Sequence, residues 1–333
     1  MPPTRRPASP FAVWTALGIV YLVWGSTYLA IAIAVETLPP LLSAAVRFLF
    51  AGIVVAAWFV LRGRRDALRV SRAQLAGAAL VGTLLLAGGN GLVVLAERTV
   101  PSGLTALVIA SVPLWLQVLR RLSGERIPGA TIAGVAVGFG GVLFLVVPRG
   151  LSGQTDAIGL LTLLGATISW SIGMFISPRL RMPRDPLAST GLQMLAGGVV
   201  LTLVAFATGE AVHLDVAAYS ARSLAALAYL VVFGSLVAFT AYTWLLQHAP
   251  VSQVATYAYV NPVVAVVLGA VVLAEPITPS VVIGAAIIVA TVAFIVNREG
   301  ARRRAAQDRV VTASAAAEAD LTGEDGGSVT MPA

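Results

Sequence analysis

Ten apolar stretches follow one another along the chain, and each is long enough to cross a lipid bilayer. They cover residues 11–35, 39–61, 73–96, 99–119, 128–147, 157–177, 187–208, 222–246, 250–274 and 279–297. A helix of about 20 apolar residues spans the ~30 Å hydrocarbon layer of a membrane. Because backbone groups in lipid must satisfy their hydrogen bonds within the segment, each stretch is expected to be a helix. The pattern predicts an all-α integral membrane protein with ten transmembrane helices.

The composition agrees with this fold and excludes several kinds of chemistry. Hydrophobic residues make up 58% of the chain and charged residues only 11%, whereas soluble domains carry about 25% charged residues. The chain has no cysteine, only His213 and His248, and no carboxylates clustered at the spacing of metal ligands. We therefore expect no catalytic residues, no metal site and no cofactor.

The chain repeats itself after about half its length. Residues of related type recur 146 to 150 positions apart: Trp24 and Trp170, Arg47 and Gln193, Glu97 and Gln247, Pro113 and Pro262, Glu125 and Glu275. Each half holds five apolar stretches, so the second half must enter the membrane from the opposite side. The prediction is two inverted five-helix repeats, as in many secondary transporters. The first repeat covers 11–148 and the second 157–297.

Arginine sets the expected orientation. All 22 basic residues are Arg, and 18 of them lie in the leader, in alternate loops and in the tail. Loops rich in Arg stay on the cytoplasmic side. We expect a multi-pass protein of the inner (cytoplasmic) membrane with both termini in the cytoplasm. Since the Arg residues follow the loops, the net charge of +7 indicates no nucleic-acid partner. The tail, 298–333, has few large apolar residues and is predicted to be disordered.

Four local motifs resemble those of EamA-type permeases of the drug/metabolite transporter superfamily. They are Trp24-Gly25-Ser26-Thr27-Tyr28, Arg47-Phe48, the stretch from Ala96 through Gly103, and the stretch from Tyr259 to Pro276. The resemblance covers about 11–297. It implies two EamA repeats around a central cavity, and movement of small metabolites or drugs, most often outward. The second half has Gln193 in place of Arg47, so the two halves are not functionally interchangeable.

The predicted function is secondary transport of a small molecule by alternating access around a cavity near the bilayer midplane. The alternatives are an integral-membrane enzyme and a membrane receptor that transports nothing. The absence of clustered reactive side chains argues against the enzyme, and the short loops leave little surface for a soluble partner of a receptor. The expected partners are the lipid bilayer and a neutral or zwitterionic substrate.

Six residues are candidates for the substrate site, and each also has a structural interpretation. Arg47 lies deep in a span, where it either contacts substrate or locks helices together. Trp24 and Trp170 recur at equivalent positions and either line a cavity or anchor the helices. Asn90, in a glycine-rich run, either binds substrate or forms a packing hydrogen bond. Tyr257 and Asn261 share a helix face just before Pro262 and are expected to line the cavity.

Three glutamates lie at the ends of spans. Glu97, Glu125 and Glu275 are expected to be interfacial residues that pair with Arg or cap helices, rather than gating or proton-binding groups. No acidic residue lies well inside a span, and proton-coupled transporters usually carry such residues. Proton antiport is therefore not predicted, although Glu97 and Glu125 near a cavity mouth remain able to titrate.

Overall fold

The computed structural model describes residues 9–151, 156–210, 212 and 214–323, and every regular element in these ranges is helical. The α-helices are α1 (Pro10–Ala34), α2 (Pro40–Leu61), α3 (Arg72–Gly82), α4 (Gly91–Ala96), α5 (Ser102–Ile109), α6 (Val112–Leu122), α7 (Gly129–Leu151), α8 (Ala157–Ile176), α9 (Pro186–Ala207), α10 (Ala221–Tyr229), α11 (Ala238–His248), α12 (Val251–Val254), α13 (Tyr257–Leu273) and α14 (Pro279–Gly323). Two π-helical segments, η2 (Thr83–Asn90) and η5 (Leu230–Val237), and three short 3-10 turns, η1 (Arg65–Leu68), η3 (Ser177–Arg179) and η4 (Val216–Ala218), complete the chain.

These elements form the ten predicted membrane crossings. Nine helices in the described ranges are long and apolar enough to span a bilayer, and the tenth crossing contains the shorter apolar helix α13. Four of these nine spans are composite: Arg72–Ala96 joins α3, η2 and α4; Ser102–Leu122 joins α5 and α6; Ala157–Arg179 joins α8 and η3; Ala221–His248 joins α10, η5 and α11. The all-α membrane fold predicted from the apolar pattern is confirmed.

The starts of the helices follow local sequence signals. Ser9 precedes α1, and its hydroxyl accepts a hydrogen bond from the Ala12 amide. Ser71 forms a capping box with Gln74 at the start of α3. The Asp156 carboxylate accepts from two amides in the first turn of α8. Each such cap contributes about 1 kcal/mol by satisfying amides that have no partner within the helix.

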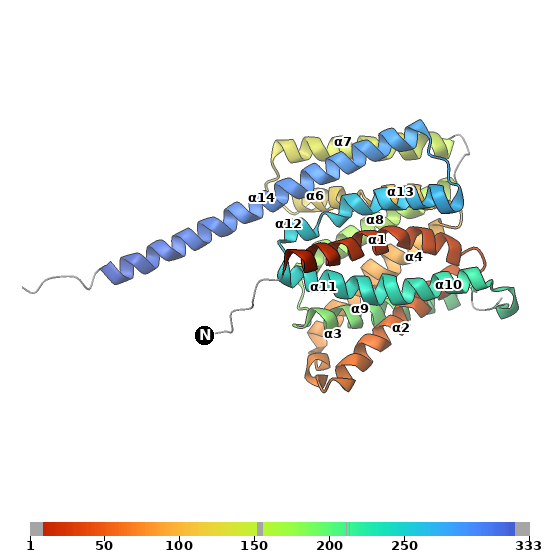
Figure 1. Ribbon diagram of the computed structural model, residues 1–333, viewed down its shortest axis with the longest axis horizontal. Coiled ribbons are helices and arrows are strands. Elements are labelled where there is room, and N and C mark those ends of the chain that lie inside the picture. The colour runs from red at the N-terminus through yellow and green to blue at the C-terminus, as the bar shows by residue number, and fades with distance from the viewer. Residues whose placement is uncertain (1–8, 152–155, 211, 213, 324–333) are drawn as a thin grey trace, which may run out of the picture.

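The packing of the helices shows the inverted repeat (Figure 1). Helix α2 packs along α9, α7 along α14, and α5 along α13, so each of these helices pairs with its counterpart in the other half. Helix α1 packs on α13 and α11, whereas α8, its counterpart, packs on α6 and η2. Exchanging the two halves therefore maps each of these crossing-to-crossing contacts onto another of them. Five crossings per half make the two repeats run in opposite senses through the membrane.

The two π-helical segments also obey this symmetry. η2 and η5 are each 8 residues long and stand 147 residues apart. A π-helical turn leaves backbone carbonyls out of the regular α-helical ladder, and such turns are frequent at functional sites. The third and eighth crossings are therefore both interrupted near mid-membrane, where the halves meet.

The tail differs from its prediction. Residues 298–333 were expected to be disordered, but α14 continues without a break to Gly323 and projects well beyond the bundle (Figure 1). The residues after Arg298 are rich in Ala and Arg, which favour helix. Extending an existing helix also avoids the cost of nucleating a new one. Residues 324–333 lie outside the described ranges.

Candidate functional site

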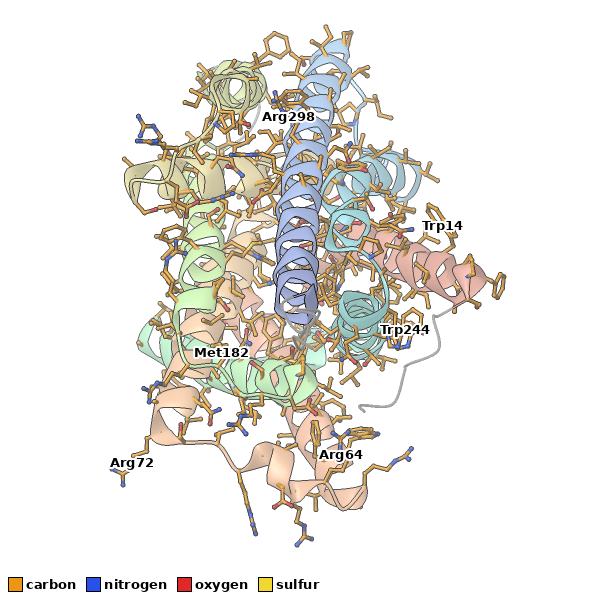
Figure 2. All side chains as sticks on the ribbon, turned by 90° about the vertical axis from the view of Figure 1, so that its left-hand side faces the viewer. Trp14, Arg64, Arg72, Met182, Trp244 and Arg298 are labelled. Carbon is orange, nitrogen blue, oxygen red and sulfur yellow. The ribbon has the colours of Figure 1, made fainter. Side chains whose placement is uncertain are left out.

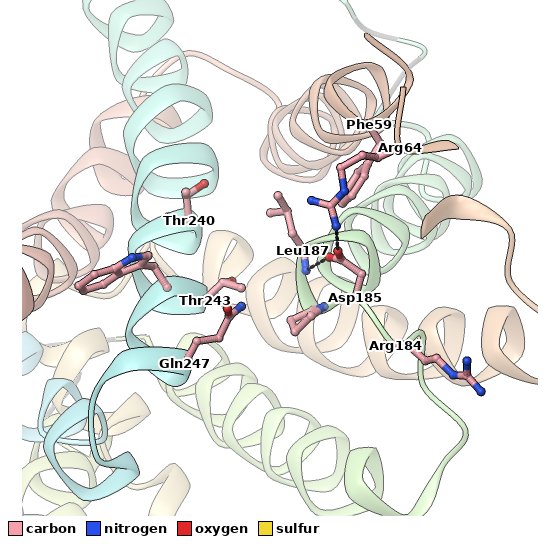
Figure 3. Close-up of a pocket in the computed structure, with 10 residues that line it drawn as sticks. Phe59, Arg64, Arg184, Asp185, Leu187, Thr240, Thr243 and Gln247 are labelled. Carbon is pink, nitrogen blue, oxygen red and sulfur yellow. Dashed lines mark hydrogen bonds and ion pairs between the residues drawn. The ribbon is translucent and has the colours of Figure 1, made fainter. Parts of the chain in front are cut away.

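A cleft opens at one end of the helix bundle, between the second, seventh and eighth crossings (Figure 3). Its volume is about 750 Å³, which is within the range of sites that bind small molecules. The lining residues are Phe59, Arg64, Arg184, Asp185, Pro186, Leu187, Thr240, Thr243, Trp244 and Gln247. We call this space the Asp185 cleft and this end of the molecule the Asp185 end.

One wall of the Asp185 cleft is the start of α9. Asp185 is the N-cap of this helix, and its carboxylate accepts from the amides of Leu187 (3.0 Å) and Ala188 (3.1 Å). Arg64, just after α2, forms an ion pair with the same carboxylate at 3.1 Å (Figure 3). The helix terminus and the ion pair together hold the second and seventh crossings side by side at this end.

The facing wall is a polar stripe on α11. Thr240, Thr243 and Gln247 are spaced three and four residues apart, so they share one face of the helix. Thr240 is exposed, whereas Thr243 is buried. The sequence shows this helical spacing of polar residues, so the polar face of α11 could have been predicted from it.

The opposite end of the bundle, which we call the Glu97 end, is closed. The Glu210 carboxylate accepts from the amides of Leu41 (3.2 Å) and Leu42 (2.8 Å) and so caps α2 across the helix interface. Leu41 and Val94 are only 4% and 3% exposed. Glu210 and Leu41 stand 146 residues from Arg64 and Leu187 of the Asp185 cleft. The second and seventh crossings are thus joined by equivalent contacts at both ends. The two ends differ in the space beside these contacts, which is a cleft of about 750 Å³ at the Asp185 end and a cavity of about 10 Å³ at the Glu97 end.

Trp24, Tyr257 and Asn261 lie together where α1 meets α13. The Trp24 and Tyr257 rings are 5.2 Å apart in an edge-to-face arrangement, and Trp24 also lies 5.1 Å from the rings of both Phe239 and Tyr242. Trp24 Nε1 donates to a carbonyl of η5, that of Gly234, at 3.2 Å. These contacts place Trp24 and Tyr257 in a half-buried aromatic cluster.

Asn261 is 8% exposed and connects the two helices. With its amide nitrogen turned toward them, it donates to the Tyr21 and Tyr257 carbonyls, each at 3.3 Å. The Tyr21 hydroxyl also hydrogen-bonds to Thr256. Asn261 thus hydrogen-bonds backbone carbonyls of both helices, and its expected place in the substrate site stays a prediction.

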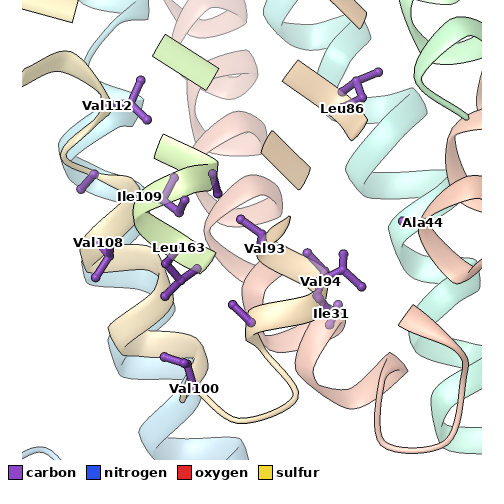
Figure 4. Close-up of a cluster of buried hydrophobic side chains, with 14 of the residues drawn as sticks. Ile31, Ala44, Leu86, Val93, Val94, Val100, Val108, Ile109, Val112 and Leu163 are labelled. Atoms are coloured by element: carbon purple, nitrogen blue, oxygen red, sulfur yellow. The ribbon is translucent and has the colours of Figure 1, made fainter. Parts of the chain in front are cut away.

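Arg47 is 5% exposed and reaches across to η5. Its Nε donates to the Ser235 hydroxyl at 2.9 Å, and its guanidinium lies 4.9 Å from the centre of the Phe48 ring. It also borders a cavity of about 10 Å³, the size of one water molecule, toward the Glu97 end. Ile31, Ala44 and Val94, which line the same cavity, belong to the apolar cluster of Figure 4.

Trp170 and Asn90 lie at the other π-helical segment, η2. A Cβ placed on Gly89 would be 2.7 Å from Trp170 Cε3, so the indole rests directly on the backbone of η2. Ser169, beside it, donates to the Leu84 carbonyl of η2 at 2.8 Å. Asn90 is the last residue of η2 and is half-buried. The contact of Trp24 of α1 with η5 is thus equivalent to the contact of Trp170 of α8 with η2.

The six candidate residues therefore divide between two π-helical segments, and none of them lines the Asp185 cleft. Trp24 and Arg47 contact η5, Tyr257 and Asn261 lie beside Trp24 and Tyr21 of α1, and the other two candidates lie at η2. The cleft is formed instead by an ion pair and a polar helix face that only the fold brings together. None of the residues that line the cleft was predicted from the sequence to be part of a site.

The three glutamates have different surroundings. The Glu275 carboxylate accepts from the Ser102 amide, the Ser102 hydroxyl and the Gly103 amide at 2.7, 2.8 and 2.9 Å, and so caps α5. Glu125 pairs with Arg120 at 2.7 Å and Arg179 at 3.3 Å. The Arg120 hydrogen bond holds the pKa of Glu125 below its ordinary value. Both residues match the expected capping and pairing roles.

Glu97 does not match its expected interfacial position. It is only 6% exposed, and no described donor meets either carboxylate oxygen in hydrogen-bond geometry. The reason is the turn of the chain after α4, which Glu97 ends. There the carboxylate faces Tyr28 and Ala32 of α1, Arg47 of α2 and Glu275 after α13.

Comparison with known proteins agrees with this architecture. The model of the EamA-like transporter family matches residues 11–147 and again 157–297. The chain belongs to this family. Two EamA matches per chain coincide with the two inverted halves of the helix bundle. The resemblance to EamA-type permeases is confirmed.

Two bacterial relatives are named as transporters. The chain is 42% identical over 256 residues to the uncharacterized inner membrane transporter YedA of Escherichia coli (strain K12), covering 76% of this chain and 80% of that protein. It is 26% identical to the uncharacterized transporter YvbV of Bacillus subtilis (strain 168), covering 88% of this chain and 94% of that protein. A solved crystal structure with 22% identity has a TM-score of 0.60 and covers 87% of this chain and 97% of its own, so the two share a fold.

These findings make the protein a membrane transporter of the inner membrane with a small-molecule substrate. The family and the relatives also point away from the alternative of an integral-membrane enzyme. Within the described residues no group of three or more His, Cys, Asp or Glu is placed to hold a metal ion.

Proposed function

We propose that this EamA-family protein is a secondary transporter that moves a small metabolite or drug by alternating access, most often outward. The observation that carries the proposal is the unequal state of two equivalent ends. The Asp185 end is open to a cleft of about 750 Å³, whereas at the Glu97 end Leu41 and Val94 are buried and the cavity beside Arg47 is only about 10 Å³. Exchanging the conformations of the two inverted repeats would close the first end and open the second.

The proposed orientation places the Asp185 end in the cytoplasm. Figure 2 looks onto this end of the bundle, and Arg64, Arg72 and Arg298 all lie on the side that faces the viewer. Cytoplasmic loops of membrane proteins are enriched in Arg and Lys. The open cleft then faces the cytoplasm, from which a substrate for export would be loaded.

The proposed substrate is neutral or zwitterionic, and the site would lie between the π-helical segments. Around η5 the candidate side chains are the rings of Trp24 and Tyr257 with the amide of Asn261, and around η2 they are Trp170 and Asn90. Aromatic rings supply apolar contact area, and amides orient a ligand by hydrogen bonds. Arg47 is the one charged candidate and could accept a single carboxylate.

The test of transport begins with a comparison of metabolites inside and outside cells that contain or lack the protein. Compounds whose distribution changes are then offered to liposomes that contain only the purified full-length chain. We expect saturable movement of at least one compound. Product formation without net movement would contradict transport and favour an enzyme.

A bulky group in the Asp185 cleft should stop this movement. The chain has no native cysteine, so Thr240→Cys can be modified selectively with a large maleimide. We expect transport to fall at least tenfold after modification, because the adduct prevents the cleft from closing, while the folded yield stays unchanged. Thr208→Cys, an exposed position at the Glu97 end, is the matched control, and equal inhibition in both variants would contradict the assignment of the cleft.

The orientation has its own test. Single cysteines at Arg64 and Val212, both exposed and at opposite ends of the bundle, are treated in intact cells with a reagent that cannot cross membranes. We expect labelling of Val212→Cys and none of Arg64→Cys until the cells are permeabilised. The reverse pattern would place the termini outside the cytoplasm. Position 153, in the linker and expected outside, lies beyond the described residues.

A further inference from the structure

Glu97 is the one glutamate of the three span-end carboxylates that is buried without a partner. Its side chain is 6% exposed, and both oxygens lack a hydrogen-bond donor among the described residues. A carboxylate in this state has lost its water without gaining protein partners, which is costly for the charged form. A neutral carboxylic acid has a much smaller cost in the same place.

The charged and titratable groups that face Glu97 come from several packed elements. They are Tyr28 on α1, Arg47 on α2 and Glu275 after α13. On α8, Asp156 is engaged by the Thr99 hydroxyl at 3.2 Å. Burial raises the pKa of the Glu97 carboxyl well above its ordinary value, and the Glu275 carboxylate adds to the rise. Arg47 and, more weakly, the Ala32 backbone act against it, yet no ion pair within 4.0 Å joins Arg47 to Glu97 in the described structure.

The repeat shows what would happen to Glu97 in the other conformation. Its counterpart lies 147 to 150 residues later, at the end of α11, where Trp244 and Gln247 line the open Asp185 cleft. When the repeats exchange conformations, Glu97 takes the place that this segment has now and lines an open cleft that water can enter. Neither Trp244 nor Gln247 can titrate, so only the Glu97 end carries an ionisable group at this position.

We infer that Glu97 is a proton-binding site of the transporter, and that uptake of a proton by its carboxylate favours closure of the Glu97 end. The inference rests on the proposed alternating access and adds a proton as a second ligand. In the closed state the carboxylic acid is buried away from water and carries no charge. When the end opens, water solvates the group and it releases the proton, so that loss of the proton holds this end open.

The direction of the pH effect follows from the two states. The closed state binds the proton more tightly, so it is favoured at low pH, and the open state is favoured as pH rises. The shift occurs between the ordinary pKa of a glutamate, about 4.3, and the raised pKa of the closed state. Within this interval one proton changes the equilibrium by up to about tenfold per pH unit.

Accessibility of a buried position beside Glu97 measures this equilibrium. Val94, on α4 one turn before Glu97, is 3% exposed, and Val212, at the same end, is 74% exposed. Val94→Cys in the full-length chain in liposomes is labelled with a maleimide over a range of pH, and Val212→Cys corrects for ionisation of the thiol. We expect the corrected rate to rise with pH by up to about tenfold per unit.

Two glutamine variants decide the assignment. Adding Glu97→Gln to Val94→Cys should leave slow labelling that no longer depends on pH, because the amide resembles the protonated acid. Glu36→Gln removes a partly exposed carboxylate at the same end, which pairs with Arg222, and should keep the pH dependence. A pH-independent rate without either substitution, or an unchanged pH dependence with Glu97→Gln, would overturn the proposal.

A spectroscopic measurement covers the case in which Val94→Cys does not fold. The infrared spectrum of the purified protein at neutral pH should contain a carboxylic-acid carbonyl band that Glu97→Gln removes and Glu36→Gln retains. Identical bands in the wild type and Glu97→Gln would overturn the proton site. Transport in liposomes without these pH effects would leave the proposed function standing, whereas absence of transport would remove the proposed function itself.

Discussion

Replacing Arg47 with alanine should lower the free energy of unfolding by about 1.5–3 kcal/mol, the value of a hydrogen bond made by a charged group. Arg47 is 5% exposed and donates to Ser235, which is itself 1% exposed. The substitution removes the side-chain hydrogen bond between α2 and η5 and leaves the Ser235 hydroxyl buried without this donor. It also leaves Glu97 without a nearby positive charge.

The matched control is Arg62→Ala. Arg62 is exposed just after α2, with its guanidinium 5.7 Å from the centre of the Trp58 ring, and an exposed contact of this kind contributes about 0.5–1 kcal/mol. Thermal unfolding of the purified proteins, together with the folded yield in membranes, measures both effects. Arg47→Lys should be intermediate, because it keeps the charge but loses the planar donor. Equal losses for Arg47→Ala and Arg62→Ala would contradict the buried contact.

Replacing Gly82 with alanine should be at least as damaging, by about 1–3 kcal/mol or more. A Cβ at Gly82, the last residue of α3, would lie 2.3 Å from the backbone oxygen of Gln193 on α9. The obstacle is backbone, which cannot turn away as a flexible side chain can. Small residues allow such close helix approach in membranes, where packing replaces the hydrophobic effect as the main attraction between helices.

The partner glycine provides an internal check. A Cβ at Gly197 of α9 would lie 2.9 Å from the Gly82 carbonyl oxygen, so the two glycines meet at one crossing point. Once Gly82→Ala has separated the helices, Gly197→Ala should cost less than it does alone. Additive losses in thermal unfolding would show that the two sites are independent.

Gly140→Ala is the control, because it should not lower the stability. Nothing lies within 4 Å of a Cβ placed at Gly140 on α7, and alanine favours helix over glycine by about 0.8–1.0 kcal/mol. We expect unchanged or slightly higher stability for this variant. A loss as large as that of Gly82→Ala would mean that helix contacts do not set the cost.

The sequence by itself determined the architecture of this protein. An apolar stretch of about 20 residues has one stable form in lipid, a helix that satisfies its own backbone, and five stretches per half force the repeats to be inverted. The caps of α1 and α3 at Ser9 and Ser71 are local too. Such features depend only on residues that are close together in the chain, so they can be predicted from the amino-acid sequence.

Only the tertiary structure decided which residues meet. Glu97, Glu125 and Glu275 look alike in the sequence, yet one is buried without a partner, one is paired with Arg, and one caps α5. The Asp185 cleft joins Arg64 to Asp185 across 121 positions of the chain. The cost or gain of a charge depends on the water and partners around it. Those surroundings come from helices far apart in the chain, so the local pattern does not contain them.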